Sequence, residues 1–495
     1  MPIRQPSSRL TAAVLLAAAV LAVRCGGSGT APAKSAAASA PSCAGTLGIE
    51  VRPLSRQARK KLGLPDDFAG ALVTEVWSGG PAAAEDIRVG DVVEKIDNSR
   101  IGNDCDFGDN AFNRSCGPSR IVVLRAGARI EAMLSPVDQT SFLEKACQAG
   151  SASACFRKGW LLWSRKGGPN TVRALELFTS ACASGSAEAC AFKALQLMDE
   201  PDRGSDSLAA GERACTLDSG AGCAHLAFLY ATGKFVKKDD HRATTLYARA
   251  CDLGDPQGCY NVGLMADQGR GGAADQGRAF AKYEEACALG SSTGCTNLGF
   301  LYENGRGVKI DKVRAVALYQ EGCDGTRCQP SNLGGCVNVG RALRDGIGLG
   351  KDEQRAAGIF REACDRKPNR DDIHADENGS RACSLLGALY IAGDGIAKDS
   401  EKGLELSALG CERGDAWGCF NAAALYSAGE GIAADAGKAA SFLDLACNGG
   451  DGEGCFNLGV AYEKGNGVAR DRRRSVELFR KSCQLGFTQA CAKRK

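Results

Sequence analysis

Hydrophobic residues recur at helical spacing through most of this chain, in a unit that repeats about nine times. In the second of its two helical runs, the apolar positions from Ala315 to Cys323 fall on one helix face. The same stripe of small and large apolar residues returns from Ala243 to Cys251 and from Ala356 to Cys364. A helical hairpin of this kind buries both faces only by stacking on its neighbours. The pattern therefore predicts an all-α solenoid over residues 137–495.

Cysteines, aspartates and glycines mark the boundaries of each unit. From Cys215 to Cys323 a cysteine recurs every 36 residues, a fixed period typical of a solenoid. An aspartate precedes each second helical run, where its carboxylate can cap free backbone N–H groups. A glycine three residues after the first cysteine fits a left-handed helix end. The aspartates are Asp239, Asp275, Asp311, Asp352, Asp399, Asp435 and Asp471, and the glycines are Gly150, Gly185, Gly254, Gly290, Gly414, Gly450 and Gly486.

The spacing of the paired cysteines favours disulfides over metal ligation. Seven intervening residues bring the end of one helix beside the start of the next, whereas zinc sites prefer two to four. A bridge that closes so short a loop stabilises the fold by roughly 2–3 kcal/mol. We expect Cys147–Cys155, Cys182–Cys190, Cys215–Cys223, Cys251–Cys259, Cys287–Cys295, Cys411–Cys419, Cys447–Cys455 and Cys483–Cys491, with Cys323–Cys336 and Cys364–Cys383 across insertions and Cys105–Cys116 before the repeats. Cys43 and Cys328 have no evident partner.

The repeated unit resembles the Sel-1-like repeat family, a relative of tetratricopeptide repeats, and in particular its cysteine-rich secreted bacterial branch. The phrase NLGFLY at 297–302, the turn GRGV at 305–308 and the LYxxxC helix end at Cys323 carry the resemblance. It implies a solenoid whose first helices line a concave face that binds proteins or peptides. Some cysteine-rich relatives are labelled penicillin-binding proteins or weak β-lactamases. The second unit departs from the pattern because residues 200–205 contain no Gly-x-Gly turn.

Residues 44–136 have a different texture, with short alternating runs that predict strands. The strand-like runs are 47–51, 71–76 and 90–93, with a hairpin over 121–134 and a short helix starting at Pro81. The phrases LGIEV, GALVTEV, VGDVVEKIDN and IVVLRAG occur in the order found in a PDZ domain of bacterial periplasmic proteases, which this region resembles. The expected architecture is thus a small β-rich PDZ-like domain followed by a disulfide-bridged α/α solenoid.

A PDZ domain binds the C-terminal end of a partner as an added strand and holds its carboxylate with backbone N–H groups. The resemblance implies peptide contacts by Thr46, Leu47, Gly48, Ile49 and Val51. The second wall of the groove departs from the family over 106–115, which leaves open whether the groove is open or closed. A PDZ-like fold that serves only as a spacer is the alternative.

The N-terminus predicts export. Residues 1–24 contain Arg4 and Arg9 followed by an apolar run and form a candidate signal peptide, and residues 25–43 form a flexible linker rich in Gly, Ser, Ala and Pro. The sequence LAVRC resembles a lipobox with Cys25 as the lipidated residue, although Arg24 departs from the small residue expected there. The 25 cysteines, mostly in pairs, favour an oxidising compartment. We expect a periplasmic or outer-membrane lipoprotein, with a secreted protein and an uncleaved anchor as alternatives.

Charge and residue chemistry offer no catalytic site. The net charge of +3 indicates no nucleic-acid partner. The three histidines (His225, His241 and His374) stand in no metal-binding pattern, and we expect surface or loop positions for them. The Ser-x-x-Lys, Ser-Asp-Asn and Lys-Thr-Gly motifs of serine β-lactamases are missing. We therefore predict neither an enzyme nor a bound metal or cofactor, with β-lactam hydrolysis as the alternative.

A ladder of asparagines is the candidate binding site of the solenoid. Each lies two residues after a cysteine, near the start of a first helix; they are Asn261, Asn297, Asn338, Asn421 and Asn457. A side-chain amide donates and accepts hydrogen bonds, so a row of them can hold an extended peptide backbone. The alternative is that each asparagine bonds within its own repeat. The predicted function is a non-catalytic scaffold or adaptor that binds proteins or peptides of the bacterial cell envelope, with a membrane contact only through the lipid anchor.

Overall fold

The computed structural model describes residues 45–493 except 55, 66–67, 69, 98, 102–117, 136, 165–167, 326–331 and 367–372. The candidate signal peptide, Cys25, the linker, Cys43, the Cys105–Cys116 pair and Cys328 lie outside the described residues. The chain divides into two compact units. The first runs to Leu301 with two short later pieces (306–309 and 325–330), and the second holds the remainder.

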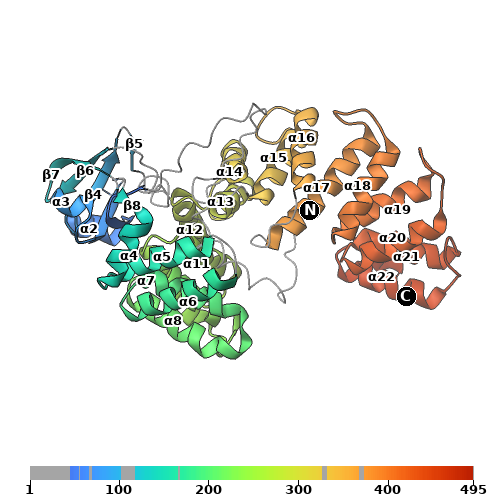
Figure 1. The fold of residues 1–495 in the computed structure, drawn as a ribbon. Helices are drawn as coiled ribbons and strands as arrows, with labels where there is room; N and C mark the ends of the chain where they lie inside the picture. The colour runs from blue at the N-terminus through green and yellow to red at the C-terminus, as the bar shows by residue number, and fades with distance from the viewer. Residues whose placement is uncertain are drawn as a thin grey trace. The chain divides into compact units, whose positions relative to one another are not determined.

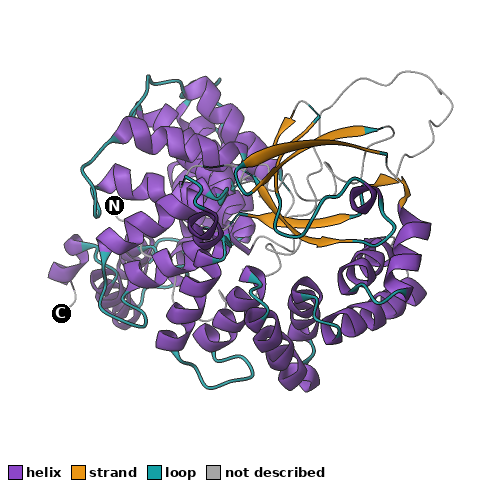
Figure 2. Ribbon diagram, turned by 90° about the vertical axis from the view of Figure 1, so that its left-hand side faces the viewer, coloured by secondary structure: helices purple, strands orange, loops and turns teal. Residues whose placement is uncertain are grey.

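The first unit begins with an antiparallel sheet, the PDZ-like domain (Figures 1 and 2). Its strands are β2 (Ile49–Pro53), β3 (Ala71–Val76), β4 (Val92–Ile96), β6 (Ser119–Arg125) and β7 (Ala128–Leu134), in the order β2-β3-β4-β6-β7, with β5 (Ser99–Arg100) paired to β4. Two short helices, α2 (Arg56–Leu62) and α3 (Pro81–Ala84), join the strands. A further pair, β1 (Gly45–Thr46) and β8 (Val137–Asp138), brings the start of the domain beside the start of the repeats.

The sheet buries one apolar core. Leu47, Val73, Ile121, Val123 and Leu134 have no exposed surface and belong to a single cluster. The β6–β7 hairpin turns at Ala126–Gly127, both with positive φ, as a tight two-residue hairpin turn requires. The predicted strands and the helix at Pro81 are present, whereas α2 was not predicted because RQARKKL carries no apolar periodicity.

The repeats form a series of helical hairpins. In the first unit their helices are α4 (Gln139–Gln148), α5 (Ala152–Ser164), α6 (Gly168–Ala183), α7 (Ala187–Gln196), α8 (Gly204–Thr216), α9 (Gly220–Thr232), α10 (Asp240–Asp252), α11 (Pro256–Gln268), α12 (Gln276–Ala288) and the start of α13 (Ser292–Asn304). In the second unit they are α14 (Lys312–Asp324), α15 (Leu333–Asp345), α16 (Glu353–Asp365), α17 (Ile373–Ala392), α18 (Ser400–Glu412), α19 (Ala416–Ala428), α20 (Ala436–Asn448), α21 (Gly452–Lys464) and α22 (Arg472–Gln484).

The predicted helix signals act as expected. Each of the seven aspartates accepts a hydrogen bond from the backbone N–H three residues later, which caps a second helix. Each of the seven glycines has positive φ. Where the second repeat lacks the Gly-x-Gly turn, two short 3₁₀ segments (Leu197–Asp199 and Pro201–Arg203) replace it. These local features set the length of every hairpin.

Small residues bring the two helices of a hairpin together. A Cβ added to Gly340 would lie 2.4 Å from the ring of Phe360, and one added to Gly459 would lie 2.7 Å from the ring of Phe479. Both aromatic rings are almost fully buried. The first helix therefore provides a hollow, and the second helix fills it with an aromatic residue.

Among the described residues, ten disulfides join successive hairpins. Eight close a sequence separation of eight, and the other two span the insertions with separations of 13 and 19. The pairs are Cys147–Cys155, Cys182–Cys190, Cys215–Cys223, Cys251–Cys259, Cys287–Cys295, Cys323–Cys336, Cys364–Cys383, Cys411–Cys419, Cys447–Cys455 and Cys483–Cys491. The predicted fold class, a small β-rich domain followed by a disulfide-bridged helical solenoid, is confirmed.

Candidate functional site

The asparagine ladder occupies one position of the first helices. Asn297 is the sixth residue of α13, and the equivalent residues of α11, α15, α19 and α21 are also asparagines. Asn261 is 6 % exposed, and the other four are half-buried. A partly buried amide can bond either protein groups or solvent. The hydrogen-bond partners of each asparagine therefore decide whether its amide is available to a ligand.

Two ladder residues bond within or next to their own repeat. The Asn297 amide donates to the carbonyl of Thr293 at 3.1 Å, one turn earlier in α13. Asn297 also bonds the hydroxyl of Tyr260, whose pKa is raised to about 12 by burial against the opposing effect of this bond. Asn338 Oδ1 accepts a 3.2 Å hydrogen bond from Arg341 on its own helix. The peptide-binding role of the ladder stays a prediction.

Asn421 differs from these two. Its Nδ2 is buried and has no hydrogen-bond partner. A buried amide donor without a partner loses roughly 1–3 kcal/mol relative to one that is bonded. Because this donor is buried, a ligand could bond it only after the Asn421 side chain turned outward.

The sixth position of α9 holds His225 in place of asparagine. Its side chain has no exposed surface, and Nε2 lies 3.1 Å from the hydroxyl of Ser207. Burial lowers its pKa to about 4, with a smaller contribution from Lys234. The expectation of a surface or loop position was wrong for His225, because the ladder position faces the neighbouring helix α8. His241 is exposed, and the side chain of His374 lies outside the described residues.

A charged network missed by sequence reasoning lies beside the ladder in the second unit. Glu303 accepts a 2.6 Å hydrogen bond from the hydroxyl of Tyr319 and a 3.1 Å bond from Arg341. Burial and the Glu303 carboxylate raise the pKa of Tyr319. In the preceding repeat the equivalent acid, Asp267, pairs with Arg306 at 2.6 Å. The signal was an acidic residue eight positions after Cys259 and after Cys295, which periodicity of apolar residues does not reveal.

The charged groups of this network bond one another and are partly exposed. Arg341 is 22 % exposed and offers N–H donors beside Asn338, while Glu303 is held by two partners. Such donors suit the carbonyl groups of a peptide.

The cysteine-containing clusters do not fit a metal. Among the described residues, Cys251 and Cys259 lie near Glu285, and Cys287 and Cys295 lie near Glu321. All four sulfurs are in disulfides and provide no thiolate ligand.

The PDZ-like loop lies at the edge of the sheet. Leu47 and Ile49 are buried in the core of the domain, Gly48 has φ of 78°, and Val51 is half-buried. Among the described strands, β2 pairs only with β3, so its other side is a sheet edge. The side chain of Thr46 and the second wall of the groove over 106–115 lie outside the described residues. The structure therefore describes one side of the expected groove.

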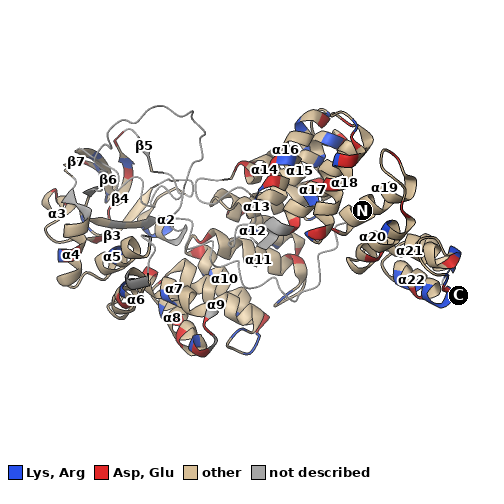
Figure 3. Ribbon diagram, turned by 45° about the vertical axis from the view of Figure 1, so that its right-hand side comes forward, with Lys and Arg blue, Asp and Glu red and all other residues tan. Residues whose placement is uncertain are grey.

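Charge and cavities add little to this site. Figure 3 shows basic residues on α22, where Arg473 is 93 % exposed. A pocket of about 250 Å³ in the first unit is lined by residues of α6, α7 and α8 that include Lys193 and Arg213. Arg213 is bonded there to the carbonyl of Ala183 at 2.8 Å. In the part of the chain that the structure describes, no helix has both the length and the apolar character needed to cross a membrane.

Comparison with protein families matches the Sel1 repeat at residues 152–186, 220–255, 256–291, 292–326, 334–368, 380–415, 418–451 and 452–487, and the PDZ domain at residues 45–133. A comparison with curated proteins finds no match.

Solved structures of repeat proteins are similar to parts of this chain. A protective antigen of uropathogenic Escherichia coli is 21 % identical with a TM-score of 0.47, covering 72 % of this chain and 82 % of its own. A Sel1 repeat protein of Oxalobacter formigenes is 18 % identical with a TM-score of 0.45, covering 68 % and 91 %. Cysteine rich protein B of Helicobacter pylori is 27 % identical with a TM-score of 0.23, covering 29 % and 94 %. From its eight matched repeats, this chain belongs to the Sel1 repeat family, with a PDZ domain ahead of the repeats.

Proposed function

We propose that this protein is a non-catalytic scaffold that binds proteins or peptides of the bacterial cell envelope. Sel1 repeats are typically protein-binding, and PDZ domains mediate protein interactions. The observation that carries the proposal is the repetition of one asparagine position, half-buried in four of five cases, on the first helices of hairpins joined by disulfides. Fixed hairpins keep the donors and acceptors in place before a ligand arrives, which lowers the entropy lost on binding.

The compartment follows from the cysteines. Ten disulfides indicate an oxidising, exported environment. We place the protein in the envelope, anchored through Cys25 or secreted. Its partners would then be other exported proteins, bound along the first helices and at the edge of β2.

The ladder is tested by removing two of its amides. In the double variant Asn297→Ala/Asn338→Ala, we expect crosslinked capture of envelope proteins to fall. Because Asn297 also bonds Thr293 and the buried Tyr260, we expect a modest loss of thermal stability beside the loss of capture. The matched control is Asn448→Ala, which removes an exposed amide on the second helix α20. A lower melting temperature with intact capture would assign the amides to their own repeats and contradict the ligand role.

No observation favours the β-lactam alternative. The sequence lacks the serine β-lactamase motifs, and Sel1 repeats are generally non-catalytic scaffolds. Turnover of a chromogenic cephalosporin by the purified chain would contradict a purely binding function.

A further inference from the structure

The PDZ-like domain contacts the first repeat through a buried tryptophan. Trp77, directly after β3, is 4 % exposed and packs in one cluster with Leu143, Ala146 and Ala154 of α4 and α5. Its indole Nε1 donates a 2.7 Å hydrogen bond to the hydroxyl of Ser153. A tryptophan that is both packed and hydrogen-bonded fixes a contact in position and in orientation.

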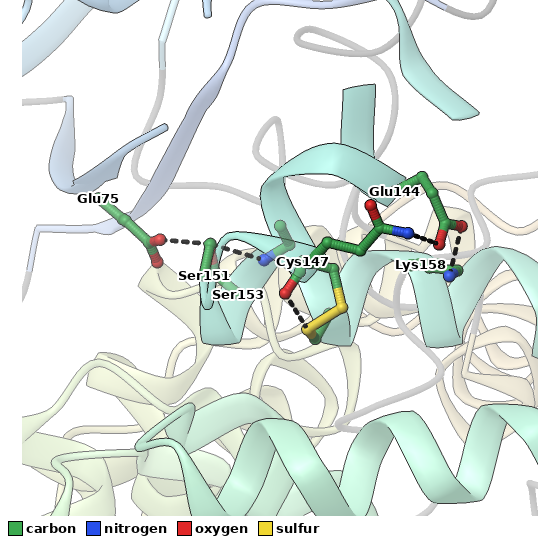
Figure 4. The surroundings of a disulfide bond; sticks show 9 residues. Glu75, Glu144, Cys147, Ser151, Ser153 and Lys158 are labelled. Carbon is green, nitrogen blue, oxygen red and sulfur yellow. Dashed lines mark hydrogen bonds and ion pairs between the residues drawn. A yellow bond between two sulfur atoms is a disulfide. The ribbon is translucent and has the colours of Figure 1, made fainter. Parts of the chain in front are cut away.

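A second polar contact lies beside the tryptophan. The hydroxyl of Ser151 donates to Glu75 at 2.5 Å, and Figure 4 shows the two side chains facing each other from the repeat and from β3. The same hydroxyl accepts from the backbone N–H of Ala154, which caps α5. Ser151 thus caps the start of α5 and hydrogen-bonds the neighbouring domain.

The first disulfide holds this contact loop from both sides. Cys147 and Cys155 enclose Ser151 and join the end of α4 to the start of α5 (Figure 4). Glu144 of α4 and Lys158 of α5 form an ion pair between the same two helices. A disulfide and an ion pair therefore fix the loop that contacts the PDZ-like domain.

The contact reaches the loop that the PDZ resemblance assigns to a peptide carboxylate. The backbone N–H of Trp77 donates to the carbonyl of Gly48 at 2.9 Å. A Cβ added to Gly80 would lie 2.9 Å from the ring of Phe142 and 3.2 Å from Cα of Gly48. Phe142 of α4 and Trp77 of the sheet, with ring centroids 6.0 Å apart, therefore support this loop from the repeat side.

We infer that the helices α4 and α5 are a structural part of the PDZ-like domain. The sheet and these two helices unfold together as one cooperative body, and the helices position the loop around Gly48. Ser186, the equivalent helix cap of α7, has no hydrogen bond to the sheet among those of the described residues. The inference goes beyond peptide binding and stands without a known ligand.

Hydrogen exchange on the full-length oxidised chain tests it. In Ser151→Ala and in Trp77→Phe, we expect the amides of Glu75 to Trp77 to exchange several-fold to about tenfold faster, as loss of a partly buried hydrogen bond implies. The control Ser186→Ala loses the same kind of cap and should leave these amides unchanged. Unchanged exchange in both test variants would overturn the inference.

The wild-type chain gives a second measurement that does not depend on a variant folding well. We expect residues 45–134 and helices α4 and α5 to lose protection together as denaturant is added. If the sheet loses protection while α4 and α5 keep theirs, the two do not form one body.

Discussion

The PDZ-like domain and the repeats are held together over different distances along the sequence. In the sheet, Ile49 pairs with Val76 and Val93 pairs with Val123, and the core joins Leu47 to Leu134. In the repeats, the disulfides mostly span eight residues, and each cap joins residues three apart. A destabilising substitution in the sheet should therefore affect the whole domain, whereas one in a repeat should affect mainly its own hairpin.

The largest expected effect comes from the core of the sheet. Leu134→Ala removes a fully buried side chain and should destabilise the PDZ-like domain by about 2–5 kcal/mol. Hydrogen exchange should show the loss across residues 45–134 and in α4 and α5, but not from α7 onward. Met133→Ala, on the same strand but 53 % exposed, is the control and should have little effect. A loss confined to β7 would contradict the long-range character of the domain.

Removing one disulfide tests the local character of the repeats. The double variant Cys287→Ala/Cys295→Ala should lose roughly 2–3 kcal/mol, because the unfolded chain regains the entropy of a short loop. We expect faster amide exchange in α12 and at the start of α13, and no change in the PDZ-like domain.

A longer bridge provides a matched comparison within the solenoid. Cys364 and Cys383 are 19 residues apart, so their removal should lose about 0.8 kcal/mol more than removal of an eight-residue pair. Equal losses for both pairs, or unfolding of distant repeats, would show that the bridges do not act through local loop closure.

The sequence predicted the short-range features of the repeats better than the long-range contacts of the PDZ-like domain. Caps, glycine turns and the apolar stripe act within a few residues, so a single repeat shows them and nine copies reinforce them. The contact of Trp77 with Ser153 joins residues 76 apart, and no periodic pattern links them. His225 was misplaced because its position was interpreted from its residue type, whereas packing against Ser207 of α8 determines its burial.

The smallest expected effect in the wild type is a pH dependence of the repeats, because two buried groups change stability in opposite directions. In the repeats, burial lowers the pKa of His225 to about 4 and raises that of Asp255 to about 6. Acid should therefore act on the repeats through these two groups.

As pH falls, His225 and Asp255 change the stability of the fold in opposite directions. Between pH 6.5 and 4 the unfolded chain binds a proton at His225 that the folded chain excludes, so stability falls with acid. Between pH 6 and 3.8 the folded chain binds a proton at Asp255 more readily than the unfolded chain, so stability rises with acid. The two effects partly cancel in the wild type, and substitutions should separate them. Asp255→Ser, which keeps a cap of the kind that Ser219 provides for α9, should steepen the loss of protection in α9 to α11 on acidification. His225→Asn should reverse its sign, and identical pH profiles for both variants would show that neither group controls the stability of these hairpins.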